Sequence, residues 1–186
     1  MAMRLSLLIA PVLIAMALPR AAHAQSNTST KNVPITGFVP IICAGGTLAG
    51  GDTFDVGVLI DTTTGFLRTD LSAPNQVLAG SFCSTRATIN VLATPMVAQN
   101  FAATPPGGFS RQVDYVATAS GWTTTPASYN TAAATNLAAT QSRATAFTGP
   151  ITVGIGGFAT GGGSALRLVA DTNYRGTVTV TLTAAD

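Results

Sequence analysis

The residues of this chain with the greatest potential for acid–base chemistry are its aspartates. All seven acidic residues are Asp, none is Glu, and the single histidine is His23. Beyond residue 23 the commonest general bases are therefore absent, and neither a Ser–His nor a Cys–His nucleophile can form. An aspartate dyad is conceivable from Asp52, Asp55 and Asp61, but Asp at these positions is ordinary turn chemistry. We therefore expect no catalytic site and rank an enzyme last among the function classes.

Metal binding has only slightly more support than catalysis. Calcium suits aspartate ligands, but no EF-hand loop is present. The glycine-rich run 154–163 lacks the aspartate of calcium-binding repeats and the lysine of a phosphate-binding loop. Trp122 and Tyr129 are the only candidate sugar-stacking aromatics near each other in sequence, although aromatic side chains usually serve packing. We expect no metal and no cofactor, with carbohydrate binding a minor alternative.

The two cysteines, Cys43 and Cys83, are the remaining reactive groups. An even cysteine count in an exported protein most simply gives one disulfide. Closing a loop of about 40 residues would stabilise the fold by roughly 4 kcal/mol in the chain-entropy model. A pair of free or metal-binding thiols is the alternative, although no third cysteine and no later histidine accompany them.

Residues 1–24 have the features of a secretory signal peptide. Arg4 precedes an apolar run over 5–18, and the triplet 22–24 is a small-x-small cleavage site. No later stretch is long or apolar enough to span a bilayer. Cleavage removes Arg4 and Arg20, so seven basic residues then balance seven aspartates. Neither a nucleic-acid-binding face nor an acidic tail is expected from this balance.

Short alternating segments separated by Gly and Pro turns dominate the rest of the chain. The composition is rich in Val, Ile, Thr, Ala and Gly, which favours strands and turns over helices. Residues 93–112 and 156–163 read as loops, and 126–148 show no clean period. The expected strands span residues 54–60, 77–83, 87–92, 113–119, 151–155, 165–170 and 177–183. This spacing predicts one all-β sandwich domain over residues 43–186.

The strictest alternation runs through residues 33–43. Its odd positions, all apolar or glycine, are Val33, Ile35, Gly37, Val39, Ile41 and Cys43. A period of two puts them on one face of a strand. The even positions include Pro34 and Pro40, which cannot donate to a ladder and so argue against an ordinary central strand. Gly37 suits a place where another group approaches closely.

The last expected strand alternates in the same way. Its even positions, Val178, Val180 and Leu182, are apolar, whereas the odd positions from 177 to 183 are all threonine. This pattern is typical of a half-buried strand with high β-propensity.

Together the two terminal segments resemble those of chaperone–usher pilins, including the spore-coat-U-like fimbrial subunits. In that family an alternating apolar segment with a central glycine follows the signal peptide. It runs directly into the first strand, which contains a cysteine. The resemblance implies that residues 25–42 are an N-terminal extension whose strand leaves its own domain and completes the immunoglobulin-like β-sandwich of a neighbour. The donor residues would be Val33, Ile35, Gly37, Val39 and Ile41.

The resemblance also implies the partners. The disulfide would join the first strand to the second, and Val178, Val180 and Leu182 would pair with a periplasmic chaperone before assembly. An outer-membrane usher would then assemble a head-to-tail homopolymer. The chain departs from the family at residues 184–186, where the commonest pilin ending carries an aromatic residue. That departure leaves the class of chaperone open.

The expected function is therefore that of a structural subunit of a bacterial surface filament, a pilus or fimbria, with a role in adhesion. Such a protein crosses the periplasm and resides at the cell surface. The alternative is a monomeric secreted or periplasmic β-sandwich binding module, in which residues 33–42 form the first strand of their own domain.

Overall fold

The structure is a computed structural model that describes residues 29–185. The chain divides into two units, residues 1–37 and residues 38–186. Within the first unit, residues 29–37 carry no helix or strand. The second unit consists of β-strands and one short 3-10 helix, which confirms the expected all-β class. The signal peptide expected over residues 1–24 lies outside the described residues.

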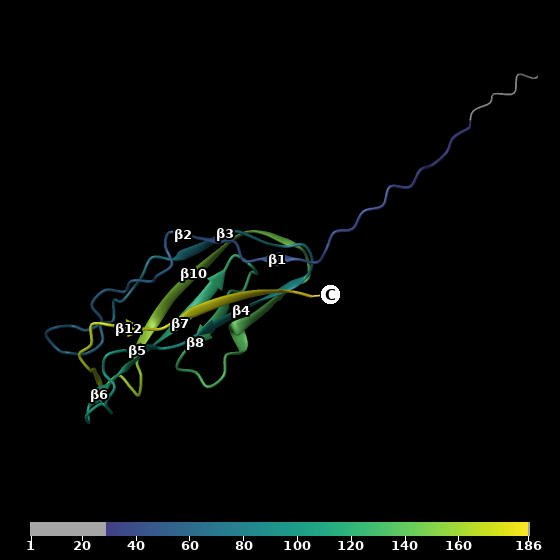
Figure 1. Cartoon of the computed structure of the whole chain (residues 1–186). Helices are drawn as coiled ribbons and strands as arrows, with labels where there is room; N and C mark the ends of the chain where they lie inside the picture. The colour runs from purple at the N-terminus through teal and green to yellow at the C-terminus, as the bar shows by residue number, and fades with distance from the viewer. Residues whose placement is uncertain (1–28, 186) are drawn as a thin grey trace, which may run out of the picture. The chain divides into compact units, whose positions relative to one another are not determined.

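The larger sheet is built on three long antiparallel strands, which Figure 1 shows side by side: β3 (Gln76–Cys83), β10 (Phe147–Thr160) and β7 (Gln112–Ser120). Short strands extend both edges of the sheet. They are β1 (Cys43–Ala44) and β2 (Thr47–Ala49) on β3, β5 (Met96–Ala98) and β8 (Ala127–Asn130) on β7, and β12 (Tyr174–Arg175) on β5. Strands β1 and β2 share one register on β3, so they act as a single edge strand interrupted at residues 45–46.

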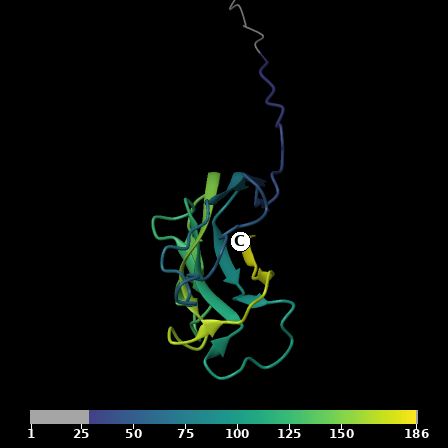
Figure 2. The ribbon, with the colours of Figure 1, turned by 90° about the vertical axis from the view of Figure 1, so that its left-hand side faces the viewer.

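A second sheet contains β13 (Val178–Ala184), β4 (Ala87–Ala93) and β9 (Thr140–Arg143), in that order. The inward side chains of β4 pack with those of β7 and β10 in one apolar core. Figure 2 shows the yellow β13 apart from the green strands of the larger sheet, as expected for a two-layer sandwich. The all-β sandwich predicted from the strand spacing is therefore present.

The two sheets are joined where a pair of strands passes from one to the other. Strand β4 continues into β5, and β12 continues into β13, so the pair leaves the larger sheet and enters the smaller one. At the crossing, the Thr94 N–H donates to the Thr177 carbonyl at 2.9 Å and the Tyr115 hydroxyl donates to the same carbonyl at 3.0 Å. A Cβ on Gly176 would lie 2.6 Å from the Thr94 carbonyl oxygen, so the close approach requires glycine.

Trp122 is completely buried, with 0% of its surface exposed. Its ring centroid lies 4.6 Å from that of Phe147, and Arg143 donates a 2.8 Å hydrogen bond to its carbonyl. Tyr129 is half-buried in β8. A sugar cannot stack on a side chain without exposed surface, so the sugar-binding interpretation of Trp122 is wrong.

Four expected strands, over 77–83, 87–92, 113–119 and 177–183, are confirmed with small changes at their ends. The strand expected over 54–60 is wrong, because only Ile60 forms a bridge, with Leu67. The side chain of Asp55 accepts a hydrogen bond from Gly57 N–H at 2.9 Å. Such local bonds compete with a ladder, and this explains the loop.

Two further expectations change near the C-terminal half. The loop expected over 156–163 is wrong at its start, because β10 continues through Gly157 to Thr160 with an irregularity between Gly156 and Ala159. The strand expected over 165–170 shrinks to β11 (Arg167–Leu168), which pairs in parallel with β6 (Phe109–Ser110). The region 126–148 holds β8, the 3-10 helix Leu137–Ala139, β9 and the start of β10. Across residues 29–185, nothing helical has the length and apolar character to cross a membrane.

Candidate functional site

Strand β13 has an open edge. Among the described residues it pairs with β4 alone. The Thr177 carbonyl accepts from Thr94 N–H, and Ala185 N–H donates to the Arg86 carbonyl, so odd-numbered residues turn their backbone groups toward β4. Because these groups alternate in direction along an antiparallel strand, the even-numbered residues of β13 turn theirs toward the open edge. A row of unpaired donors and acceptors is therefore available there.

The side chains of β13 follow the alternation expected from the sequence. Val178, Val180 and Leu182 pack against the core but remain half-buried, whereas the threonines between them are exposed. The residues whose side chains point inward are thus the ones whose backbone groups face the open edge. A further strand on that edge would cover all three apolar side chains.

A groove of about 940 Å³ lies beside this edge. Residues 174–180 line it, together with Gly45, Gly46, Leu48 and residues 52–54 from β2 and its flanking loops. Five mainly apolar residues from the larger sheet and the strand crossing also line it: Leu78, Met96, Tyr115, Val153 and Ile155. A groove with apolar lining residues beside an open strand edge suits an extended peptide segment.

Two polar side chains in the groove hydrogen-bond to backbone carbonyls of residues that line it. The Tyr115 hydroxyl is tied to Thr177, and burial raises the pKa of Tyr115 to about 12. The buried Gln76 donates from Nε2 to the Thr53 carbonyl at 3.2 Å, which holds the loop after β2, and its Oε1 has no partner. These contacts shape the groove.

The disulfide between Cys43 and Cys83 joins β1 to β3. The two cysteines stand directly opposite each other in the strand register, and this confirms the pairing and rules out free thiols in the structure. The bond anchors the start of the sandwich immediately after the N-terminal extension.

The extension itself offers an exposed apolar surface. Residues 29–42 carry no strand, and Ile35 is 97% exposed. The other apolar side chains exposed in this segment are Val33, Phe38, Val39, Ile41 and Ile42. Just before β1, the Ser84 N–H donates to the Ile42 carbonyl at 2.9 Å, and the Ile42 N–H donates to the Ser84 hydroxyl at 3.0 Å. The chain is therefore held against the turn between β3 and β4 as it leaves the sandwich.

The aspartates considered for chemistry serve separate turns. Asp52 accepts from the Thr53 hydroxyl, and Asp55 accepts from Gly57 N–H. The backbone N–H groups of Thr63 and Thr64 donate to Asp61 and lower its pKa. Within the described part of the chain, no three His, Cys, Asp or Glu residues come together as a metal site.

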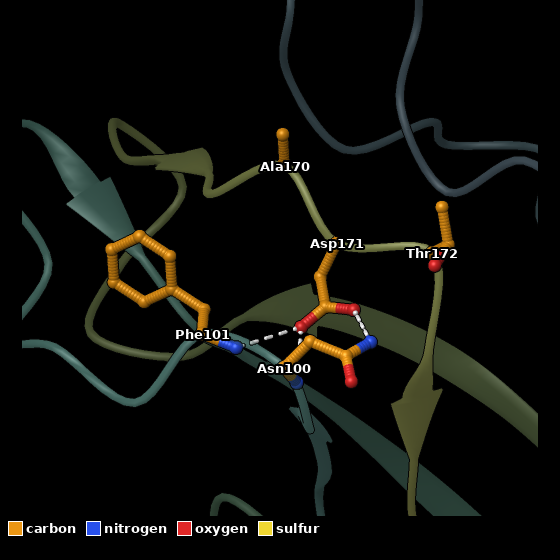
Figure 3. A pocket seen from close by; sticks show the side chains of 5 residues that line it. All are labelled: Asn100, Phe101, Ala170, Asp171 and Thr172. Carbon is orange, nitrogen blue, oxygen red and sulfur yellow. Dashed lines mark hydrogen bonds between the residues drawn. The ribbon is translucent and has the colours of Figure 1, made fainter.

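A second, shallower pocket of about 320 Å³ surrounds Asp171 (Figure 3). The Asp171 carboxylate accepts from both nitrogens of Asn100 and from the N–H groups of Phe101 and Asn173, at 2.7–3.0 Å. Desolvation by itself would raise the pKa of Asp171, but these hydrogen bonds together lower it. The carboxylate is fully used in clamping two loops. In the sequence this residue is marked only by the Asp-x-Asn spacing at 171–173, which indicates a turn and not a clamp between loops.

No protein-family model, no curated protein and no solved structure matches this chain. A functional assignment for the groove, the open edge and the extension therefore rests on their geometry.

Proposed function

We propose that this protein is the structural subunit of a bacterial surface filament, in which residues 33–41 of one copy dock on the open edge of β13 in the next. In this proposal the sandwich is pilin-like and immunoglobulin-like, lacks one strand, and is completed by its neighbour. One observation carries the proposal. The same chain has an exposed apolar segment outside any sheet and, beside a groove, a strand edge without a partner among the described residues.

The positions of the prolines fit this docking. The even residues of β13 point their side chains into the core and their backbone groups toward the incoming strand. The residues that face them must therefore also have inward side chains, and their N–H groups must be free to donate. In the extension, the odd residues are the apolar set, and all of them have an N–H. Pro34 and Pro40 have the opposite parity, so their missing N–H groups face away from β13. The reverse parity would place both prolines against the ladder.

Gly37 supports docking on another chain. A Cβ at this position would meet no atom within 4 Å, and its backbone does not have a positive φ. Nothing in the described structure therefore requires glycine here. A close approach to a neighbouring subunit supplies the missing reason.

The direction of the docked strand follows from where each subunit's own chain leaves. Residues 40–42 lie against Ser84, and Ala185 bonds to Arg86, so the extension departs at the end of the sandwich where β13 finishes. The body of the incoming subunit must then lie at the other end, near Val178. Its strand therefore runs antiparallel to β13. Because the head-to-tail contact does not close into a ring, repeated docking generates an open filament.

The energy of docking is adequate for a stable contact. Burying Val33, Ile35, Val39 and Ile41 would contribute about 1.5–3 kcal/mol each, roughly 6–12 kcal/mol gross. Backbone pairing adds to this and ordering of the extension opposes it. Before assembly the open edge is an aggregation hazard. A periplasmic chaperone that covers it, and an outer-membrane usher that replaces the chaperone by the next subunit, complete the proposal.

The test is gel electrophoresis in SDS of material sheared from cells that export the full chain, with unboiled and boiled samples side by side. Strand-docked polymers are kinetically stable, so we expect a ladder before boiling and a single monomer band after it. A variant without residues 25–42 should fold but give no ladder. Monomer alone in the unboiled full-chain sample would contradict the proposal and favour the secreted binding module with residues 33–42 paired in their own domain.

A further inference from the structure

Building on the proposed function, we propose that the docked strand has one register, with Gly37 of the incoming subunit opposite Val180 of the receiving one. In this register, Phe38 of the incoming subunit contacts Leu92 of the receiving subunit across the outer face of the smaller sheet. This second contact lies outside the groove and distinguishes one register from its neighbours.

The outer face of the smaller sheet has a single large apolar side chain among its described strands. Leu92 on β4 is 52% exposed, and its cross-strand neighbour on β13 is Thr179. The other outward residues of β4 are Thr88 and Asn90, which are polar. An exposed leucine beside the open edge is a natural contact for an apolar side chain on an added strand.

Phe38 is the matching residue on the extension. It is 87% exposed and belongs to the even set, so it faces outward when the odd residues fill the groove. Adjacent strands lie about 4.8 Å apart. A phenylalanine beside Thr179 therefore stands two strand spacings, about 9.6 Å, from Leu92. The two long side chains can meet over the small threonine when they lean toward each other.

Placing Phe38 beside Thr179 fixes every other pair by counting along two antiparallel strands. Four inward pairs result: Val39 with Val178, Gly37 with Val180, Ile35 with Leu182, and Val33 with Ala184. Gly37 then lies opposite Val180, whose side chain points into the groove. Because glycine has no side chain, it leaves room there for the valine.

A shift of two residues would move Phe38 beside Thr177 or Thr181. The cross-strand neighbours of these threonines are the polar Thr94 and Asn90, so the apolar contact with Leu92 would be lost.

Disulfide cross-linking between two copies of the full chain measures the register. One copy carries Thr36→Cys, and the other carries Thr181→Cys, Thr179→Cys or Thr183→Cys. Thr36 faces outward, and in the proposed register it lies opposite Thr181 as a non-hydrogen-bonded pair, with Cα atoms about 4.5 Å apart. A shift of two residues moves the partner by roughly 7 Å along the strand, beyond the reach of a disulfide. After mild oxidation and boiling without reductant, we expect the cross-linked dimer with Thr181→Cys and its loss with the other two.

The role of the outer contact is tested by adding Phe38→Ser to the first copy or Leu92→Ser to the second. We expect the cross-link to spread from residue 181 to 179 and 183, while the unboiled ladder persists because the groove contacts remain. Leu137→Ser is the matched control, since Leu137 is 95% exposed on the 3-10 helix, and it should leave the pattern unchanged.

The outcomes separate the register from the proposed function. A cross-link confined to 179 or 183 overturns the register while strand docking stands. A Phe38→Ser variant that still cross-links at 181 alone overturns the role of the Phe38–Leu92 contact and leaves the register in place. Absence of both cross-links and ladder overturns strand docking itself, and the register with it.

Discussion

At the scale of single residues, the polar groups of this protein fasten chain segments together. Asp171 clamps two loops through backbone and side-chain donors, and Gln76 holds the loop above the groove. Tyr115 ties the floor of the groove to the point where β13 begins. Each of these side chains bonds to a backbone group of a neighbouring segment, although the Oε1 atom of Gln76 has no partner.

Because of Tyr115, we expect the folded protein to lose stability at alkaline pH. Its pKa in the folded protein is about 12, above that of an exposed tyrosine. The neutral phenol is therefore favoured by folding, so this stabilisation is complete below pH about 10 and is lost as pH rises from about 10 to about 12. We expect the free energy of unfolding in urea to fall over that interval, and Tyr115→Phe to remove part of the fall.

Tyr115→Phe should also cost about 1 kcal/mol at neutral pH, because the hydrogen bond to Thr177 is lost. Tyr129→Phe is the control, since Tyr129 is half-buried on β8 and lies outside the residues that line the groove. A Tyr115→Phe variant with the same alkaline dependence as the unmodified protein would show that another group titrates.

At the scale of elements, the sequence predicted strands well where alternation is clean and where the partner strand is near. Residues 113–119 and 177–183 read correctly because each has one buried face. The segment 54–60 alternates equally well, yet side-chain turns at Asp55 and Asp61 hold it as a loop. Single-sequence periodicity measures amphipathicity and does not include this local competition.

Features that depend on distant contacts could not be read from the sequence. The continuation of β10 past Gly156 depends on pairing with β7, and the passage of β12 into β13 depends on Thr94. For the candidate site, the sequence indicated the apolar extension and the half-buried last strand. It did not show the open edge or the groove, since these depend on how the strands pair and how the two sheets pack.

Substitution of Gly176 tests whether the strand crossing that joins the two sheets is rigid. Gly176→Ala should destabilise the protein by about 1–3 kcal/mol, because the new Cβ meets backbone atoms that cannot move independently. Thermal unfolding of the variant measures the loss. Gly107→Ala is the matched control, because a Cβ there meets nothing within 4 Å and the residue has no positive φ. Equal melting temperatures for the two variants would contradict a rigid crossing at Gly176.

At the scale of the whole molecule, the sandwich and the extension have features that match. The sandwich has a strand edge beside a groove, and the described part of the extension has alternating apolar residues outside any sheet. The inward set is even-numbered in β13, and the apolar set is odd-numbered in the extension. If the two belong together between molecules, a peptide copy of the extension should complete the sandwich without any polymer forming.

A synthetic peptide of residues 29–42, added to the variant without residues 25–42, which should fold with a free edge and form no polymer, should therefore raise its melting temperature. Ligand at about 100 times its dissociation constant stabilises by about 2.7 kcal/mol. For a domain of this size that corresponds to a shift of about 5–10 °C. The control peptide has the same composition with Pro34 exchanged with Ile35 and Val39 exchanged with Pro40, so both prolines take the parity that faces β13. Because each proline then removes a ladder hydrogen bond and displaces an inward side chain, we expect little or no shift from this control. Equal shifts from both peptides would show that apolar composition alone drives binding, and no shift from either would show that the groove does not accept this segment.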